Sequence, residues 1–106
     1  MAMTDNGRPL ILFQGDSITD NSRNRDIHDD LGIGYAALAA AWYQALFPER
    51  MARFINRGIG GHTVLDLKGR WQQDCLDLKP DLVSILVGIN DAAQTFLGTA
   101  STTVTE

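Results

Sequence analysis

The chain has 106 residues, 44% of them hydrophobic and 21% charged, and its formal net charge at pH 7 is -4. This length allows one domain at most, and this composition is typical of a folded globular protein rather than a disordered one. The acidic balance and the scattered lysines and arginines argue against nucleic acid or an anionic membrane as a partner. Residues 1–9 lack a signal-peptide core and no run approaches about twenty apolar residues, so we expect a cytoplasmic location.

The first predicted strand covers residues 10–13 and follows a loose leader over residues 1–8. It leads into the turn Gly15-Asp16-Ser17, which places a serine where open parallel sheets bind their ligands. By itself this turn also has a structural explanation, because glycine tolerates positive φ and Asp and Ser bond to nearby backbone amides. The serine is therefore a candidate nucleophile only if other segments support it.

A polar loop over residues 20–30 follows, and its acidic and histidine residues are the one cluster that could hold a metal. We interpret it as a solvated loop and expect neither a metal nor a cofactor. Residues 34–47 are predicted to form a helix, with Tyr35, Leu38, Trp42 and Leu46 at helical spacing and Pro48 at its end. We expect its aromatic residues to face the core or the sheet. Its apolar content on nearly all sides indicates a second covering element.

A short second strand is predicted at residues 52–55, followed by a glycine-rich turn over residues 56–63. Thr63 and Asp66 have the form of a capping box that opens a helix over residues 63–78. Cys75 falls in the apolar stripe of this helix and is predicted to be a packed residue rather than a reactive thiol. Residues 82–87 then form an almost uninterrupted apolar strand, as expected for a parallel strand buried on both faces.

The third strand is followed by Gly88-Ile89-Asn90-Asp91, and the Thr-rich residues 99–106 are expected to fray. The alternation of strands and helices predicts an α/β fold with a parallel sheet. A serine, a glycine turn and an asparagine then follow three successive strands at the same end of the sheet. Together they supply a nucleophile and donors for an oxyanion, which is the apparatus of acyl transfer. Asp16 and Asp91 are expected to brace the turns.

These three segments, in this order, resemble three of the four blocks of the SGNH (GDSL) hydrolase family over roughly residues 10–91. The resemblance implies a three-layer α/β/α flavodoxin-like sheet, of which about three strands and two helices are present, with strand one between strands two and three. It implies Ser17 as nucleophile, with oxyanion donors from the Ser17 amide, the Gly61 amide and the Asn90 side chain. Gly61 is preferred to Gly60 because the glycine of this block precedes a polar residue, here His62.

The fourth block, Asp-x-x-His, is absent, because Arg25 lies three before His28 and Ile59 three before His62. We therefore expect residues 1–106 to be one partial domain, with the leader at 1–8, the motifs at 9–91, and the start of the next segment or a frayed tail at 92–106. We expect the protein to be an esterase or lipase, and we expect residues 1–106 alone to be inactive. It should act on small acyl esters, including acetylated carbohydrates, and self-associate or pair with a carboxyl-terminal half. The alternative is that His62 is a substitute base.

Two readings without catalysis remain. In one, residues 58–63 of a flavodoxin-like binding module cradle a phosphate. Thr63 argues against this reading, since a dinucleotide fingerprint starting at Gly58 requires glycine there. In the other, the chain is an interaction unit that associates through the open edge of its third strand.

Overall fold

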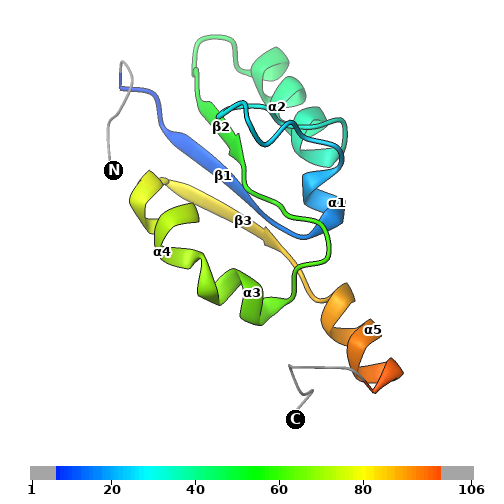
Figure 1. Ribbon diagram of the computed structural model, residues 1–106. Coiled ribbons are helices and arrows are strands. Elements are labelled where there is room, and N and C mark those ends of the chain that lie inside the picture. Colours follow the sequence, from blue (N-terminus) through cyan, green and yellow to red (C-terminus); the bar gives the residue numbers. More distant parts are fainter. Residues whose placement is uncertain (1–6, 99–106) are drawn as a thin grey trace.

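The computed structural model describes residues 7–98, which form one parallel sheet with helices on both faces (Figure 1). The strands are β1 (Leu10–Gly15), β2 (Arg53–Asn56) and β3 (Leu82–Leu86), in the order β2-β1-β3. The prediction of an α/β fold with strand one in the centre is confirmed. The predictions for residues 1–6 and 99–106 lie outside the described residues.

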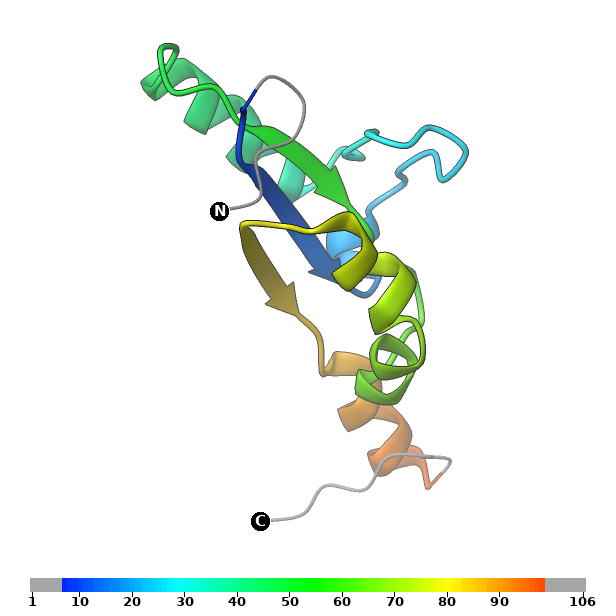
Figure 2. The same cartoon turned by 90° about the vertical axis from the view of Figure 1, so that its left-hand side faces the viewer.

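The helices along the chain are α1 (Ser17–Asp20), α2 (Tyr35–Leu46), α3 (Val64–Gly69), α4 (Trp71–Asp74), the 3-10 turn η1 (Leu76–Leu78) and α5 (Ile89–Leu97). Helix α2 covers one face of the sheet, and α3 and α4 lie on the other (Figure 2). Helix α5 extends beyond the end of β3 (Figure 1).

The strand pattern produces two cores, because successive side chains of a strand point to opposite faces. On the α2 face, Phe13 and Phe54 pack with the small residues Ala36 and Ala40. On the α4 face, the cluster consists of Leu10, Leu12, Ile55 and Cys75. The prediction of Cys75 as a packed residue is confirmed.

The single helix predicted over residues 63–78 is wrong in its continuity. The capping box of Thr63 and Asp66 is present, but the segment divides into α3, α4 and η1. Gly69 ends the first piece, and Arg70 leaves helical geometry with φ -114° and ψ 12°. Glycine favours such a break because it loses more conformational entropy in a helix than other residues do.

Two predictions about burial are also wrong. Tyr35 and Tyr43 of α2 pack toward the sheet, whereas Trp42 is 69% exposed, and Leu38 and Leu46 are exposed with it. Strand β3 is not buried on both faces, since Leu82 and Leu86 are exposed. Helix α2 covers β1 and β2 and does not reach across to β3 (Figure 2).

Two helices were not predicted. The serine turn continues as α1, and the Asn90-Asp91 segment lies in the first turn of α5 rather than in an irregular turn. Within the part of the chain that is described, no helix has the length and apolar character needed to cross a membrane.

Candidate active site

Ser17 is the first residue of α1 and follows β1 after a single residue, Asp16. Asp16 is buried and caps the helix, with its carboxylate accepting the amide of Ile18 at 3.0 Å. This confirms that Asp16 braces the turn. Ser17 itself is exposed, and among residues 7–98 no atom accepts a hydrogen bond from its amide. The turn therefore presents both a hydroxyl and a free N–H.

Two glycines allow the chain to close tightly around this turn. A Cβ on Gly15 would lie 2.2 Å from the carbonyl oxygen of Leu86, and one on Gly58 would lie 2.5 Å from the amide nitrogen of Asp20. No side chain fits at such distances, so both positions require glycine. The consequence is that the segment after β2 lies directly against α1.

The glycine turn reaches Ser17 at Gly60, where an added Cβ would lie 3.7 Å from the Cβ of Ser17. The two neighbouring amides differ. The Gly60 amide donates to Asp20 Oδ2 at 3.1 Å, while the Gly61 amide has no acceptor within the described part of the chain. Only the second amide is available to a ligand.

Asn90 approaches the same turn from α5. Its Nδ2 donates to the carbonyl oxygen of His62 at 3.0 Å, and both carboxylate oxygens of Asp91 lie within 3.2 Å of the Val64 amide nitrogen. Asp91 thus braces the turn, as expected. An amide group has two N–H donors, so Asn90 keeps a second one for another partner. Ser17, Gly61 and Asn90 all follow the carboxyl ends of the strands at one end of the sheet (Figure 1).

Arg70 joins the serine turn to the glycine turn. Its side chain is only 10% exposed and carries an ion pair to Asp74 at 3.2 Å. Its other acceptors are the carbonyl oxygens of Gly15 and Arg57, the side-chain oxygen of Gln14, and Nδ1 of His62. One guanidinium group therefore binds the end of β1, the start of the loop after β2, and the histidine of the glycine turn.

The bond from Arg70 decides the tautomer of His62. Arginine has only donors, so Nδ1 of His62 must be an acceptor at the 3.0 Å distance between it and Arg70 Nε. The neutral ring then carries its proton on Nε2 and cannot accept another there. This argues against His62 as the substitute base. The other histidine, His28, has its Nδ1 3.0 Å from Nη2 of Arg57.

Asn56 and Asp20 also position the site, and sequence reasoning gave them no role. Asn56 is fully buried and donates to the carbonyls of Thr19 and Leu31 while accepting the Gly58 amide at 2.8 Å. Burial alone would raise the pKa of Asp20, but hydrogen bonds from Arg25 and the Gly60 amide and the charges of Arg25 and Arg23 outweigh it, so its pKa is lowered. Asp20 is therefore a charged anchor for the glycine turn.

No group of three or more His, Cys, Asp or Glu side chains among residues 7–98 is arranged to hold a metal ion. In the loop over residues 20–30, Asp30 accepts the Asn24 amide at 2.6 Å, and His28 contacts Arg57. These contacts are those of a folded loop.

Comparison with known proteins agrees with this architecture. Residues 13–104 match the GDSL-like Lipase/Acylhydrolase family. An acetylxylan esterase from Geobacillus stearothermophilus is 49% identical over 85 residues, which cover 76% of this chain and 39% of the relative. A solved structure of that esterase superposes with a TM-score of 0.78 and 46% identity, covering 83% of this chain and 42% of the other.

A GDSL-like lipase from Parabacteroides merdae superposes with a TM-score of 0.84 and 36% identity, covering 93% of this chain and 48% of that one. The chain thus spans less than half the length of each of these relatives. Other solved structures of the Geobacillus esterase carry changes at a serine, an aspartate and a histidine, and are described as catalytic mutants. On the strength of the match over residues 13–104, the chain belongs to the GDSL-like lipase/acylhydrolase family.

Proposed function

We propose that the protein to which these residues belong hydrolyses carboxylic esters, with Ser17 as the nucleophile. The observation that carries the proposal is the pair of free amides beside an exposed serine hydroxyl. The Ser17 and Gly61 amides have no acceptor among residues 7–98, and the Ser17 side chain lies next to Gly60. Donors held in advance at the place where charge develops stabilise the transition state of acyl transfer.

In this mechanism Ser17 Oγ attacks the ester carbonyl carbon, and the negative charge moves to the carbonyl oxygen. The amides of Ser17 and Gly61 and the free N–H of the Asn90 side chain donate to that oxygen. Gly61 is a better donor than Gly60, because Asp20 already accepts from the Gly60 amide. Asp91 and Arg70 hold the glycine turn and do not touch the reacting atoms.

The proton of Ser17 needs a base, which we place outside the described residues. Both histidines in this part of the chain are engaged by arginines, His62 by Arg70 and His28 by Arg57. The catalytic mutants of the Geobacillus esterase at a serine, an aspartate and a histidine support a triad whose last two members lie in the remainder of the protein. These 106 residues should not hydrolyse esters unaided.

For the substrate, we propose small acyl esters, with acetylated carbohydrates as the first class to test. The support is the relationship to an acetylxylan esterase at 49% identity. The open position of Ser17 at the surface fits a substrate whose bulk stays outside the protein.

For the partner, we propose that a carboxyl-terminal half pairs with β3. Leu82 and Leu86 lie exposed on the face of the sheet against which α2 packs, beyond the reach of that helix, and Ile85 is exposed on the other face. Exposed strand edges of this kind associate with further strands. These exposed residues also support the alternative of a non-catalytic module that associates with itself, so that self-association of the isolated 106 residues is expected in either case.

The test compares Ser17→Ala and Asn90→Ala in the full-length protein, with an acetylated xylooligosaccharide and a short-chain aryl ester as substrates. Ser17→Ala should abolish hydrolysis above background. Asn90→Ala should slow it by about 10² to 10³-fold, the usual cost of one oxyanion donor. Asn24→Ala, in the exposed loop, is the control and should leave turnover unchanged. Turnover by Ser17→Ala at the wild-type rate would show that the serine turn is structural and favour the non-catalytic alternative.

A further inference from the structure

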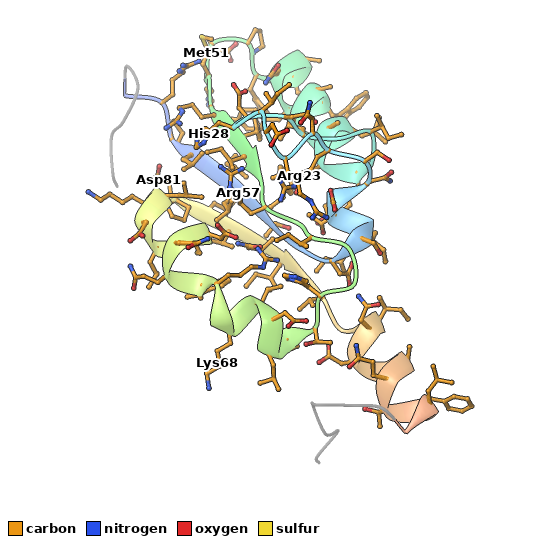
Figure 3. All side chains as sticks on the ribbon, viewed as in Figure 1. Arg23, His28, Met51, Arg57, Lys68 and Asp81 are labelled. Atoms are coloured by element: carbon orange, nitrogen blue, oxygen red, sulfur yellow. The ribbon has the colours of Figure 1, made fainter. Side chains whose placement is uncertain are left out.

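A recess lies beside the serine turn, between the loop after α1 and helix α4. It encloses about 430 Å³, and arginines line much of it: Arg23, Arg25 and Arg57, together with His28. Figure 3 labels Arg23, His28 and Arg57, which lie near β2 and the loop after α1. None of the residues proposed for ester hydrolysis lines this cavity.

Arg23 is the unusual member of the lining because it is only 9% exposed. Its Nε donates to the Gly58 carbonyl at 2.9 Å and lies 3.8 Å from Asp20 Oδ1. Within residues 7–98, no atom accepts a hydrogen bond from its terminal nitrogens Nη1 and Nη2. Buried polar groups are normally hydrogen-bonded, and a buried charge is normally paired. The two terminal nitrogens of Arg23, its free end, therefore lack the hydrogen-bond acceptors that buried donors normally have.

The other two arginines of the lining have partners within the chain. Arg57 donates through Nη1 to the His28 carbonyl at 2.9 Å and contacts the His28 ring through Nη2 at 3.0 Å. Arg25 binds Asp20 at 2.5 Å. These contacts place two further guanidinium groups at the cavity wall.

The local charge is positive although the chain as a whole is not. Four arginines are to be counted, the three of the lining and Arg70, which forms an ion pair at 3.2 Å with Asp74 of the lining. Three aspartates oppose them: Asp26 and Asp74 in the lining, and Asp20, which is bound by Arg25. This leaves an excess of one positive charge, since four minus three is one, in a chain whose net charge is -4.

We propose that this cavity binds an oxyanion, a carboxylate or a phosphate group, through the free end of Arg23. A planar guanidinium matches both groups with two parallel N–H donors. Ile59 lines the cavity, and the next residue, Gly60, lies against Ser17. The anion cavity and the proposed ester site are therefore adjacent along the glycine turn. The anion has two possible sources, an acidic group on the ester substrate or a free anion such as phosphate.

Binding is tested with inorganic phosphate on the full-length protein, by titration calorimetry at low ionic strength. We expect saturable binding that weakens as salt is added, because salt screens charge pairs. Arg23→Gln should weaken it by about tenfold, the size expected for hydrogen bonds to a charged group. Arg50→Gln is the matched control, since Arg50 is exposed and its guanidinium lies 5.6 Å from the Phe47 ring centre, away from the cavity. It should bind phosphate like wild type.

A second variant covers the case in which Arg23→Gln does not fold. Arg25→Gln changes a side chain that is 52% exposed, and it should weaken phosphate binding by about threefold. These measurements need no turnover, so they remain informative if the proposed ester hydrolysis is wrong.

The source of the anion is separated by comparing acetyl esters of glucose and of glucuronate. If the substrate carries the anion, the glucuronate ester should have the higher kcat/KM, phosphate should compete with it, and Arg23→Gln should remove the difference. If the anion is free, the two esters should react equally while phosphate still binds. The proposal is overturned if phosphate and glucuronate show no saturable binding, or if Arg23→Gln and Arg50→Gln bind them equally.

Discussion

The two edges of the sheet differ in whether their side chains find partners within the chain. On the β2 side, two polar side chains are satisfied within the chain: Asn56 bonds three backbone groups, and Arg70 bonds five acceptors. On the β3 side, Leu82 is 59% exposed and Phe96 of α5 is 90% exposed. Polar contacts close the first edge, whereas the second edge is open and exposes apolar side chains.

This difference explains how a chain that spans less than half the length of its relatives can hold the serine and glycine turns in place. The serine and glycine turns are held by hydrogen bonds that begin and end in residues 7–98, so their geometry does not depend on a second half. The apolar surface of β3 does depend on one, because exposed apolar area of this kind favours association. Three experiments test how far the contrast holds.

The largest expected effect comes from Arg70→Met in the full-length protein. The variant keeps an apolar stem of similar length but removes every donor to Gly15, Arg57, Gln14, His62 and Asp74. We expect a loss of about 3 to 5 kcal/mol in the free energy of unfolding, as for breaking a buried charged network. Urea denaturation measures it.

Arg50→Met is the matched control for that experiment. Arg50 is exposed and lies over the Phe47 ring, so its removal should cost less than about 1 kcal/mol. Equal losses in the two variants would mean that the network of Arg70 does not stabilise the closed edge.

Leu82→Lys tests the open edge in two contexts. In the isolated 106 residues the side chain is already exposed, so the change should cost little stability and should raise the monomer fraction in sedimentation velocity. In the full-length protein, where we propose that β3 is covered, it should cost about 3 kcal/mol through lost burial and a buried charge.

Leu76→Lys serves as the comparison, because Leu76 is similarly exposed but belongs to η1 and not to the strand. It should have a small effect in both proteins. If Leu82→Lys were equally harmless in the full-length protein, β3 would not be covered by a second half.

The smallest effect concerns the cap of α3. Hydrogen bonds from the Thr63 amide, and then from its hydroxyl, lower the pKa of Asp66 from the ordinary value of 3.8. A lowered pKa in the folded state means that the carboxylate stabilises the fold above the unfolded value and loses this contribution as the pH falls below it. Asp66→Asn should therefore cost less than about 1 kcal/mol at neutral pH and less than that near pH 3, because the contribution is lost as the pH falls through the lowered pKa of the folded carboxylate.

The control for the cap is Asp77→Asn, at an exposed carboxylate whose one partner among the described residues is Gln72. Urea denaturation of the full-length protein at both pH values should show no comparable change between neutral and acidic pH. A cost for Asp66→Asn that is undiminished near pH 3 would contradict the assignment to the ionised carboxylate.

Local signals, such as apolar runs, glycine turns and the Thr63–Asp66 capping box, were sufficient to predict the three strands and the turns that carry Ser17 and Gly61. The order of the strands was predicted only by the resemblance to the SGNH hydrolase family. The helix start at Ile89 was missed because its N-cap position is a glycine without a capping side chain. The exposure of Leu82 and Trp42 was missed because an apolar side chain indicates burial in a complete domain.

The polar network could not be predicted for a different reason. Arg70 bonds Gln14 and Gly15, which lie 56 and 55 residues earlier in the chain. Nothing near Arg70 distinguishes it from a surface arginine, and only the folded backbone brings these acceptors together. Cavities such as that of Arg23 are equally invisible, because their lining comes from separate loops.

Cys75 lies in the core between the sheet and α4, and its thiol can report on local opening of the structure. Its side chain is 2% exposed among Leu10, Leu12 and Ile55, and burial raises the pKa of its thiol. Only the thiolate reacts with alkylating reagents, so the folded thiol is protected twice, by access and by protonation. Residues 1–106 contain no other cysteine to interfere. The rate at which a thiol reagent labels the protein therefore measures how often the helix layer lifts from the sheet.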